Sequence, residues 1–133
     1  MLEDTALSLV EQAWTCVGRH DVDALLALLA PDVRWEIPKM PAVPFAGLWL
    51  GRDGVRRFFE IVAATQETIA FAPNAFIARG DTVVVLGRFE NLVKATGKTV
   101  CSEWAQVWTA RAGLLVAMRE HVDTLAVNAA YLD

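Results

Sequence analysis

The stretch that decides the fold runs from residue 82 to residue 123 and reads TVVVLGRFENLVKATGKTVCSEWAQVWTARAGLLVAMREHVD. Three segments of it, residues 82–94, 98–110 and 114–123, have the alternating pattern of β-strands. The glycine-containing turns between them are of hairpin length. These residues therefore predict three antiparallel strands in succession.

A fourth strand is expected immediately upstream, at residues 67–79, joined to the next by a turn at Gly80-Asp81. Pro73 interrupts this segment, and proline cannot donate a ladder hydrogen bond. The segment is therefore expected to lie at the edge of the sheet or to contain a bulge.

The first half of the chain is expected to be mainly helical, because apolar residues recur there at helical spacing. The helices cover residues 4–18, capped by Asp4 or Thr5, residues 22–30, capped by Asp21, and a third segment capped by Asp53. Residues 32–37 alternate as a half-buried strand, and the proline-rich residues 38–51 are typical of an irregular loop. A short last helix, residues 125–131, follows the cap Asp123.

The resulting order is α-α-β-α-β-β-β-β-α in one domain covering residues 1–133. Helices segregated from an antiparallel sheet indicate the α+β class. A chain of this length has room for one ordinary domain.

Composition excludes several classes of function. The chain is 55% apolar, yet it contains no apolar run of the roughly 18–20 residues that a membrane span needs. Its net charge of −4 argues against nucleic acid and against anionic membranes as partners, since both need a positively charged surface. The apolar surplus points instead to a ligand pocket, an oligomer interface, or both.

The chain offers no pattern for a metal or a cofactor. Its histidines, His20 and His121, are far apart in sequence, as are Cys16 and Cys101, so no metal-ligand spacing exists. We therefore expect no cofactor and two reduced thiols. The N-terminus has no basic region before its apolar residues, which predicts a cytoplasmic protein.

Several phrases along the chain are similar to a known family. They are HDVDAL at 20–25, LAPDVRW at 29–35, GRDGV at 51–55, ATGK at 95–98 and MREHVDT at 118–124. The chain resembles a SnoaL-like domain of the ketosteroid isomerase and nuclear transport factor superfamily. This resemblance implies a cone-shaped fold in which a curved antiparallel sheet wraps around a deep pocket closed by the N-terminal helices. It also implies homodimers formed through the sheet.

Alternation along the strands assigns side chains to faces. If the turn at 111–113 pairs residue 110 with residue 114, Trp104 lies opposite Glu120 and Gln106 opposite Met118. A two-residue turn would place Ala105 opposite Glu120 instead, and a one-residue slip exchanges the faces. We favour the first register because it gathers five side chains on one concave surface, namely Trp104, Gln106, Trp108, Met118 and Glu120.

The steroid isomerase activity of the superfamily is excluded, because other residues stand at the positions of its catalytic side chains. The resemblance places its base at Ile37, its tyrosine at Ala13 and its aspartic acid donor at Ala105 or Gln106. None of these side chains can transfer a proton.

For two other activities of the superfamily, this chain matches some of the catalytic residues. SnoaL-type polyketide cyclases use a pocket acid that matches Glu120, but their histidine falls at Gln106. Limonene-1,2-epoxide hydrolases use an Asp–Arg–Asp set, which matches Arg88, Glu90 and Glu120, with glutamate in place of aspartate. Their water-holding tyrosine and asparagine fall at Trp35 and Ile37. Arg88, Glu90 and Glu120 are therefore the candidate catalytic residues, and a structural ion pair or simple exposure is the alternative.

A small hydrophobic molecule is the expected ligand. The residues expected to bind it are Trp35, Phe45, Trp104, Gln106, Trp108 and Met118, although large aromatic residues more often belong to the core. Burial is expected to raise the pKa of Glu120, whereas a nearby Arg88 would lower it. Because two carboxylates that share one arginine cannot both ionise cheaply, one acid of the pair, Glu120 in preference to Glu90, is expected to have a raised pKa.

Three functions stay open at this point. They are a cofactor-free enzyme, a ligand-binding domain without chemistry, and a structural dimer filled by its own aromatic side chains. A homodimer is expected to form through the apolar sheet face that we assign to Val83, Val85, Phe89, Ala105 and Val107.

Overall fold

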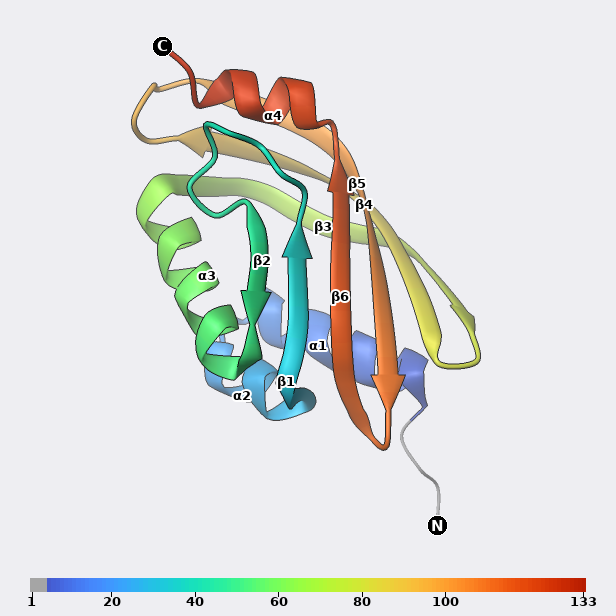
Figure 1. Ribbon diagram of the computed structural model, residues 1–133. Helices are drawn as coiled ribbons and strands as arrows, with labels where there is room; N and C mark the ends of the chain where they lie inside the picture. Colours follow the sequence, from blue (N-terminus) through green and yellow to red (C-terminus); the bar gives the residue numbers. More distant parts are fainter. Residues whose placement is uncertain (1–4) are drawn as a thin grey trace.

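The computed structural model describes residues 5–133, which form four helices and one six-stranded sheet (Figure 1). The helices are α1 (Ala6–Gly18), α2 (Val22–Leu28), α3 (Gly51–Thr65) and α4 (Thr124–Ala130). The strands are β1 (Leu29–Ile37), β2 (Gly47–Leu50), β3 (Gln66–Arg79), β4 (Thr82–Val93), β5 (Thr99–Arg111) and β6 (Leu114–Val122). The expected α+β class and the order of its elements are confirmed.

The sheet has the strand order β2-β1-β6-β5-β4-β3 and is strongly curved (Figure 1). Every neighbouring pair is antiparallel except β1 and β6, which run parallel. Helices α1, α2 and α3 lie on one side of the sheet, and α4 lies across the end at which β6 finishes. We call the side turned towards α1 the inner face and the other side the outer face.

Two features differ from the expected elements, a short strand and a helix cap. Gly47–Leu50, within the expected loop, pairs with β1 as the short strand β2, because its prolines all lie before Gly47. The expectation that Asp53 caps α3 is wrong: Leu50 occupies the cap and makes no side-chain cap hydrogen bond. Thr5, Asp21 and Asp123 cap α1, α2 and α4 as expected, while Asp4 lies outside the described residues.

The β5–β6 hairpin has a turn and a compensating bulge. Arg111 pairs with Leu114, so the turn has two residues, and the register then shifts between Thr109 and Ala110. The turn and the bulge each shift the strand pairing by one residue. Together they leave each side chain on the face that the favoured register assigns to it. The favoured pairing of Trp104 with Glu120 is therefore wrong, but the grouping of the five side chains on one face is confirmed, with Gln106 opposite Glu120.

The faces of β4 are the reverse of those expected. Val83, Val85 and Phe89 are buried on the inner face, because Val83 pairs with Trp108 and Val85 with Gln106. The outer face of β4 carries Val84, Leu86, Arg88, Glu90 and Leu92. Both faces of this strand are largely apolar, so its sequence alone does not indicate which face is buried.

Aromatic side chains fill the space between α1 and the inner face. The Trp14 ring of α1 stacks on Trp104 at a centroid distance of 5.0 Å, and Phe71 of β3 stacks on Trp104 at 5.2 Å. Gly87 makes this possible, since a Cβ at that position would collide with the Trp104 ring and with the Ala72 carbonyl. The core is therefore packed by the protein's own aromatic residues.

Within residues 5–133, no helix has both the length and the apolar character required to cross a membrane.

Candidate functional site

Glu120 lies near the end of β6 on the inner face, opposite Gln106 of β5. The Gln106 amide nitrogen donates a hydrogen bond to Glu120 Oε1 at 3.0 Å. The Gln106 amide oxygen in turn accepts a hydrogen bond from the Trp108 indole Nε1 at 3.0 Å. The three side chains therefore form a chain of hydrogen bonds that ends on the carboxyl group of Glu120, a half-buried residue.

Burial raises the pKa of Glu120 to about 7, because enclosure disfavours the charged form, while the Gln106 hydrogen bond partly opposes this rise. The expected direction is confirmed, but its cause is burial alone and not a second carboxylate. A carboxyl group with this pKa is present in both protonation states at neutral pH. It can therefore accept or donate a proton.

Arg88 and Glu90 do not join Glu120. Arg88 is exposed on the outer face of β4, opposite Glu103 of β5, and Glu90 lies opposite Cys101 on that same face. The expectation that these residues share the concave surface with Glu120 is wrong, because the faces of β4 are reversed. The charge pattern that matches an epoxide hydrolase is not assembled on the inner face.

The aromatic residues expected to bind a ligand are buried around Glu120 and in the adjoining core. Trp35 packs edge-on against Trp108 at 5.4 Å, and Phe45 packs against Phe58 at 5.9 Å. Met118 lies between Trp35 of β1 and Trp108 of β5 in the sheet register. These residues share the inner face with Glu120 or cover it, as expected, and their binding of a ligand remains a prediction.

Three buried indole nitrogens, those of Trp14, Trp35 and Trp104, have no hydrogen-bond partner among the described residues. Trp14 lies within the helix predicted for residues 4–18, and the sequence patterns do not assign it to the site. Its aromatic type and its position on the buried stripe were the available signals. Only the packing of α1 across β5 brings it onto Trp104.

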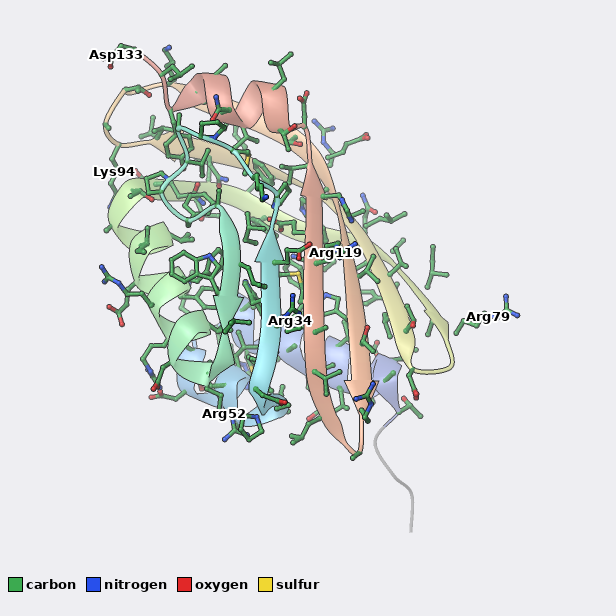
Figure 2. The ribbon with its side chains drawn as sticks, in the orientation of Figure 1. Arg34, Arg52, Arg79, Lys94, Arg119 and Asp133 are labelled. Atoms are coloured by element: carbon green, nitrogen blue, oxygen red, sulfur yellow. The ribbon has the colours of Figure 1, made fainter. Side chains whose placement is uncertain are left out.

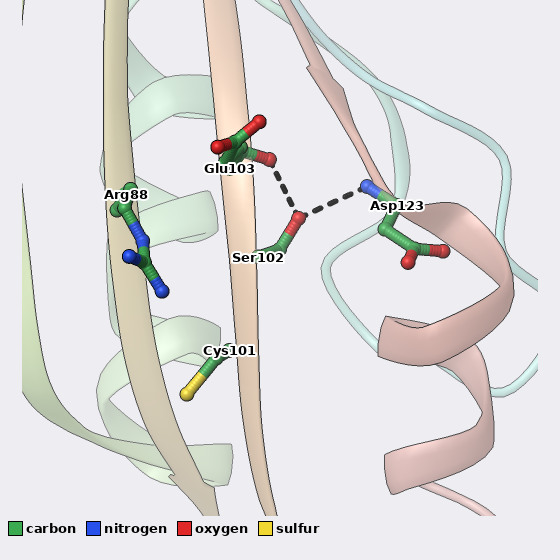
Figure 3. A pocket seen from close by; sticks show the side chains of 5 residues that line it. All are labelled: Arg88, Cys101, Ser102, Glu103 and Asp123. Atoms are coloured by element: carbon green, nitrogen blue, oxygen red, sulfur yellow. Dashed lines mark hydrogen bonds between the residues drawn. The ribbon is translucent and has the colours of Figure 1, made fainter.

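Two of the surface hollows lie on the outer face. The larger, of about 420 Å³, is lined by Arg88, Cys101, Ser102, Glu103 and Asp123 (Figure 3). The Ser102 hydroxyl donates to the Glu103 carbonyl oxygen at 2.6 Å and accepts from the Asp123 backbone N–H at 3.0 Å, so its hydrogen bonds lie within the protein. This hollow lies on the opposite side of the sheet from Glu120.

The smaller hollow, of about 230 Å³, lies over β1, β6 and β5 and is lined in part by Arg34, Glu36 and Arg119. Arg119 Nε and Glu36 Oε2 form an ion pair at 2.8 Å. Figure 2 shows Arg34 and Arg119 on the neighbouring strands β1 and β6. Within residues 5–133, no group of three His, Cys, Asp or Glu side chains is close enough to hold a metal ion.

Solved structures share this fold over nearly the whole chain. An NTF2-like protein from Burkholderia thailandensis superposes with a TM-score of 0.89 at 30% identity, covering 98% of this chain and 99% of that one. An NTF2-like protein from Burkholderia xenovorans gives a TM-score of 0.86 at 30% identity over 95% of each chain. TerC, co-crystallised with polyporic acid, gives 0.82 at 26% identity over 96% of this chain and 98% of TerC.

No protein of curated function matches the sequence. The sequence model of the SnoaL-like domain matches residues 10–118, which include β1 through most of β6 and with them Gln106 and Trp108. The chain therefore belongs to the SnoaL-like domain family.

Proposed function

We propose that this protein is a cofactor-free enzyme in which Glu120 transfers a proton to or from a small, largely apolar substrate. The proposal rests on the carboxyl group of Glu120. This group accepts a hydrogen bond from Gln106, and burial raises its pKa to about 7. A general base or acid works best when its pKa lies near the working pH. Perturbed carboxyl groups in apolar surroundings are typical of active sites.

The chemistry is that of a single carboxyl group. Arg88 and Glu90 lie on the outer face, so the two-carboxylate mechanism of an epoxide hydrolase has no second acid beside Glu120. Gln106 can hold a substrate oxygen or the carboxylate but cannot titrate. These features favour a cyclase-like or isomerase-like proton transfer at carbon, with Glu120 as the group that takes and returns the proton.

In this proposal the substrate reaches Glu120 from the inner face, past the stacked rings of Trp14, Phe71 and Trp104. Trp14, Phe71 and Trp104 stack over the inner face, so substrate binding in this proposal displaces the Trp14 ring of α1 from the Trp104 ring of β5. A flat apolar molecule that takes the place of Trp14 would restore the lost stacking.

Hydrogen–deuterium exchange at carbon tests the proposal without knowledge of the natural product. The probe is 2-tetralone, a small apolar ketone with acidic C–H bonds beside its carbonyl, incubated with the protein in D2O and followed by proton NMR. The wild-type protein should accelerate exchange, with a rate that rises as Glu120 ionises near pH 7. Glu120→Gln should lose about 100-fold or more of that rate.

Glu103→Gln is the matched control, since Glu103 is an exposed carboxylate on the outer face of β5. It should retain the wild-type exchange rate. Exchange at the wild-type rate in Glu120→Gln would overturn the proposal. Limonene-1,2-epoxide should not be hydrolysed, because the outward position of Arg88 and Glu90 leaves no paired acid at the site.

A second function, ligand binding without chemistry, is favoured by a different observation. Three buried indole N–H groups near the inner face have no acceptor among the described residues, and a ligand with carbonyl or hydroxyl oxygens would supply acceptors. TerC, a similar protein, was crystallised with polyporic acid, which makes that compound the first probe. Thermal stabilisation by polyporic acid, without exchange of 2-tetralone by the same protein, would favour this second function.

We also propose that two copies associate through their outer faces. The centre of this face is apolar, with Val84 opposite Val107 and Leu86 opposite Ala105. These residues replace the expected Val83, Val85 and Phe89, which are buried inside the protein. An apolar patch of this kind is buried when it packs on its own symmetry mate.

Light scattering at micromolar concentration tests the association, with a dimer expected. Val107→Glu should produce monomers, whereas Leu125→Glu, at an 83% exposed apolar residue on α4, should remain dimeric. A monomeric wild-type protein would contradict the proposal.

A further inference from the structure

We infer that Trp108 is a positioning residue for Glu120, acting through Gln106: it sets the orientation of the Gln106 amide so that its nitrogen, and not its oxygen, faces the Glu120 carboxyl group. This inference rests on the proposed function, in which Glu120 is the proton-transfer group. It deepens that function by assigning the control of the group to two neighbouring side chains on β5.

The chemistry of the indole group imposes the orientation. An indole N–H can only donate, whereas an amide has a donating nitrogen and an accepting oxygen. Trp108 donates to the Gln106 oxygen at 3.0 Å, which turns the amide nitrogen to Glu120 Oε1, also at 3.0 Å. A flipped amide would place N–H against N–H at Trp108 and oxygen against oxygen at an ionised Glu120. Both ends of the chain therefore favour one orientation.

Packing holds Trp108 in place. The residue is 2% exposed, its ring meets Trp35 edge-on at 5.4 Å, and Met118 lies opposite it on β6. Gln106 is also buried, at 5% exposed. A buried amide cannot exchange its partners for water, so the Trp108 indole, which can only donate, fixes the amide orientation whether or not Glu120 is ionised.

Charged groups on the surrounding elements face away from Glu120. On the strands, the outer face or the exposed surface carries Arg34 and Glu36 of β1, Arg88 and Glu90 of β4, Glu103 of β5, and Arg119 and His121 of β6. Glu11 of α1 and Lys39 of the loop before β2 are exposed, and α4 contains no charged residue. Within the described residues, Gln106 is therefore the polar side chain that forms a hydrogen bond with Glu120.

The consequence is a definite effect on proton affinity. An amide nitrogen that donates to Glu120 stabilises the carboxylate and opposes the upward effect of burial on its pKa. Without the Trp108 indole, the amide is free to turn and present its oxygen to the protonated acid. That arrangement stabilises the protonated form, so the pKa of Glu120 should rise further.

Carbon-13 NMR titration of the Glu120 side-chain carboxyl group, in the full-length protein without ligand, tests the inference. Trp108→Phe should move the midpoint upward by about one pH unit, the size of one buried hydrogen bond. Gln106→Met, which removes the amide, should move it upward by a similar amount. The double variant should match Gln106→Met alone, since Trp108 has no route to Glu120 once the amide is gone.

Trp35→Phe is the matched control. Trp35 is buried beside Trp108, but its indole nitrogen has no partner among the described residues, so the Glu120 midpoint should stay in place. An unchanged midpoint in Trp108→Phe would overturn the inference. So would a Trp108→Phe shift that persists in the Gln106→Met background, because it would show an effect that bypasses the amide.

The wild-type protein supplies a second measurement if a variant does not fold. The Trp108 indole N–H resonance should titrate with the same midpoint as Glu120, while that of Trp35 should not, and independence of the Trp108 resonance from the Glu120 titration would overturn the inference. These readouts need no turnover. Loss of 2-tetralone exchange therefore tests the proposed function separately from the role of Trp108.

Discussion

The two faces of β5 place their side chains in opposite surroundings. Its inner face directs Trp104, Gln106 and Trp108 into an aromatic core, and its outer face directs Cys101 and Glu103 to the surface. Glu120 on the inner side of the neighbouring strand has a pKa raised to about 7 by burial. A carboxylate on the outer side, such as Glu103, is surrounded by water. The face on which a carboxyl group lies therefore decides how far the protein removes it from water.

The largest expected effect comes from removing the central inner ring. Trp104→Ala deletes the side chain that stacks with both Trp14 and Phe71, and it should lower the free energy of unfolding by about 4 kcal/mol. Glu103→Ala, one residue earlier on the outer face, should change it by less than about 0.5 kcal/mol. Urea unfolding measures the free energy of unfolding of both variants. Equal losses would contradict the difference between the two faces.

Gly87→Ala tests how closely the inner face is packed. The added methyl group collides with the Trp104 ring and with the Ala72 carbonyl, so the free energy of unfolding should fall by about 3 kcal/mol. The neighbouring substitution Arg88→Ala lies on the outer face and should cost less than about 0.5 kcal/mol. A folded Gly87→Ala variant of wild-type stability would show that the Trp104 ring can move aside.

The pH dependence of stability sharpens the contrast between the faces. The pKa of Glu120 is raised by burial from 4.5 to about 7, so the folded protein binds this proton more tightly than the unfolded chain does. The stability associated with Glu120 is therefore complete below pH 4.5 and is lost as the pH rises to about 7. Glu120→Gln, which stays neutral, should be more stable than wild type by about 3 kcal/mol at pH 8.

At pH 4.5 the advantage of Glu120→Gln should largely disappear, because Glu120 is then protonated in the folded state. Glu103→Gln serves as the control at both pH values and should differ little from wild type. Urea unfolding at pH 4.5 and pH 8 compares each of the two variants with the wild-type protein. A Glu120→Gln difference that is independent of pH would mean that the carboxyl group is not enclosed.

The smallest effect is expected on the outer face. Arg119→Ala breaks the 2.8 Å ion pair with Glu36, but the Arg119 side chain is 61% exposed. The free energy of unfolding should fall by less than about 1 kcal/mol, and this cost should shrink in high salt. The NMR midpoint of Glu120 should not change, because Arg119 points away from it. A shift of that midpoint would show that charge acts across the sheet.

Much of the candidate site was accessible from local sequence patterns. The alternation in β5 and β6 placed Trp104, Gln106, Trp108, Met118 and Glu120 on one face, and the structure confirms that grouping. The register was wrong because a two-residue turn and a bulge each shift the pairing by one residue and together preserve the faces. A bulge has no reliable local signature, so the partner of Glu120 was misassigned even though its face was correct.

Sequence by itself determined the helices, the strands other than β2, their order and the inward position of Glu120, because helical and strand periodicities act over a few neighbouring positions. Tertiary structure decided which face of β4 is buried, since apolar side chains lie on both of its faces and pairing with β5 distinguishes them. It also decided that Gln106, and not Arg88, is the partner of Glu120. Such choices depend on contacts between residues far apart in the chain, and local periodicity carries no information about them.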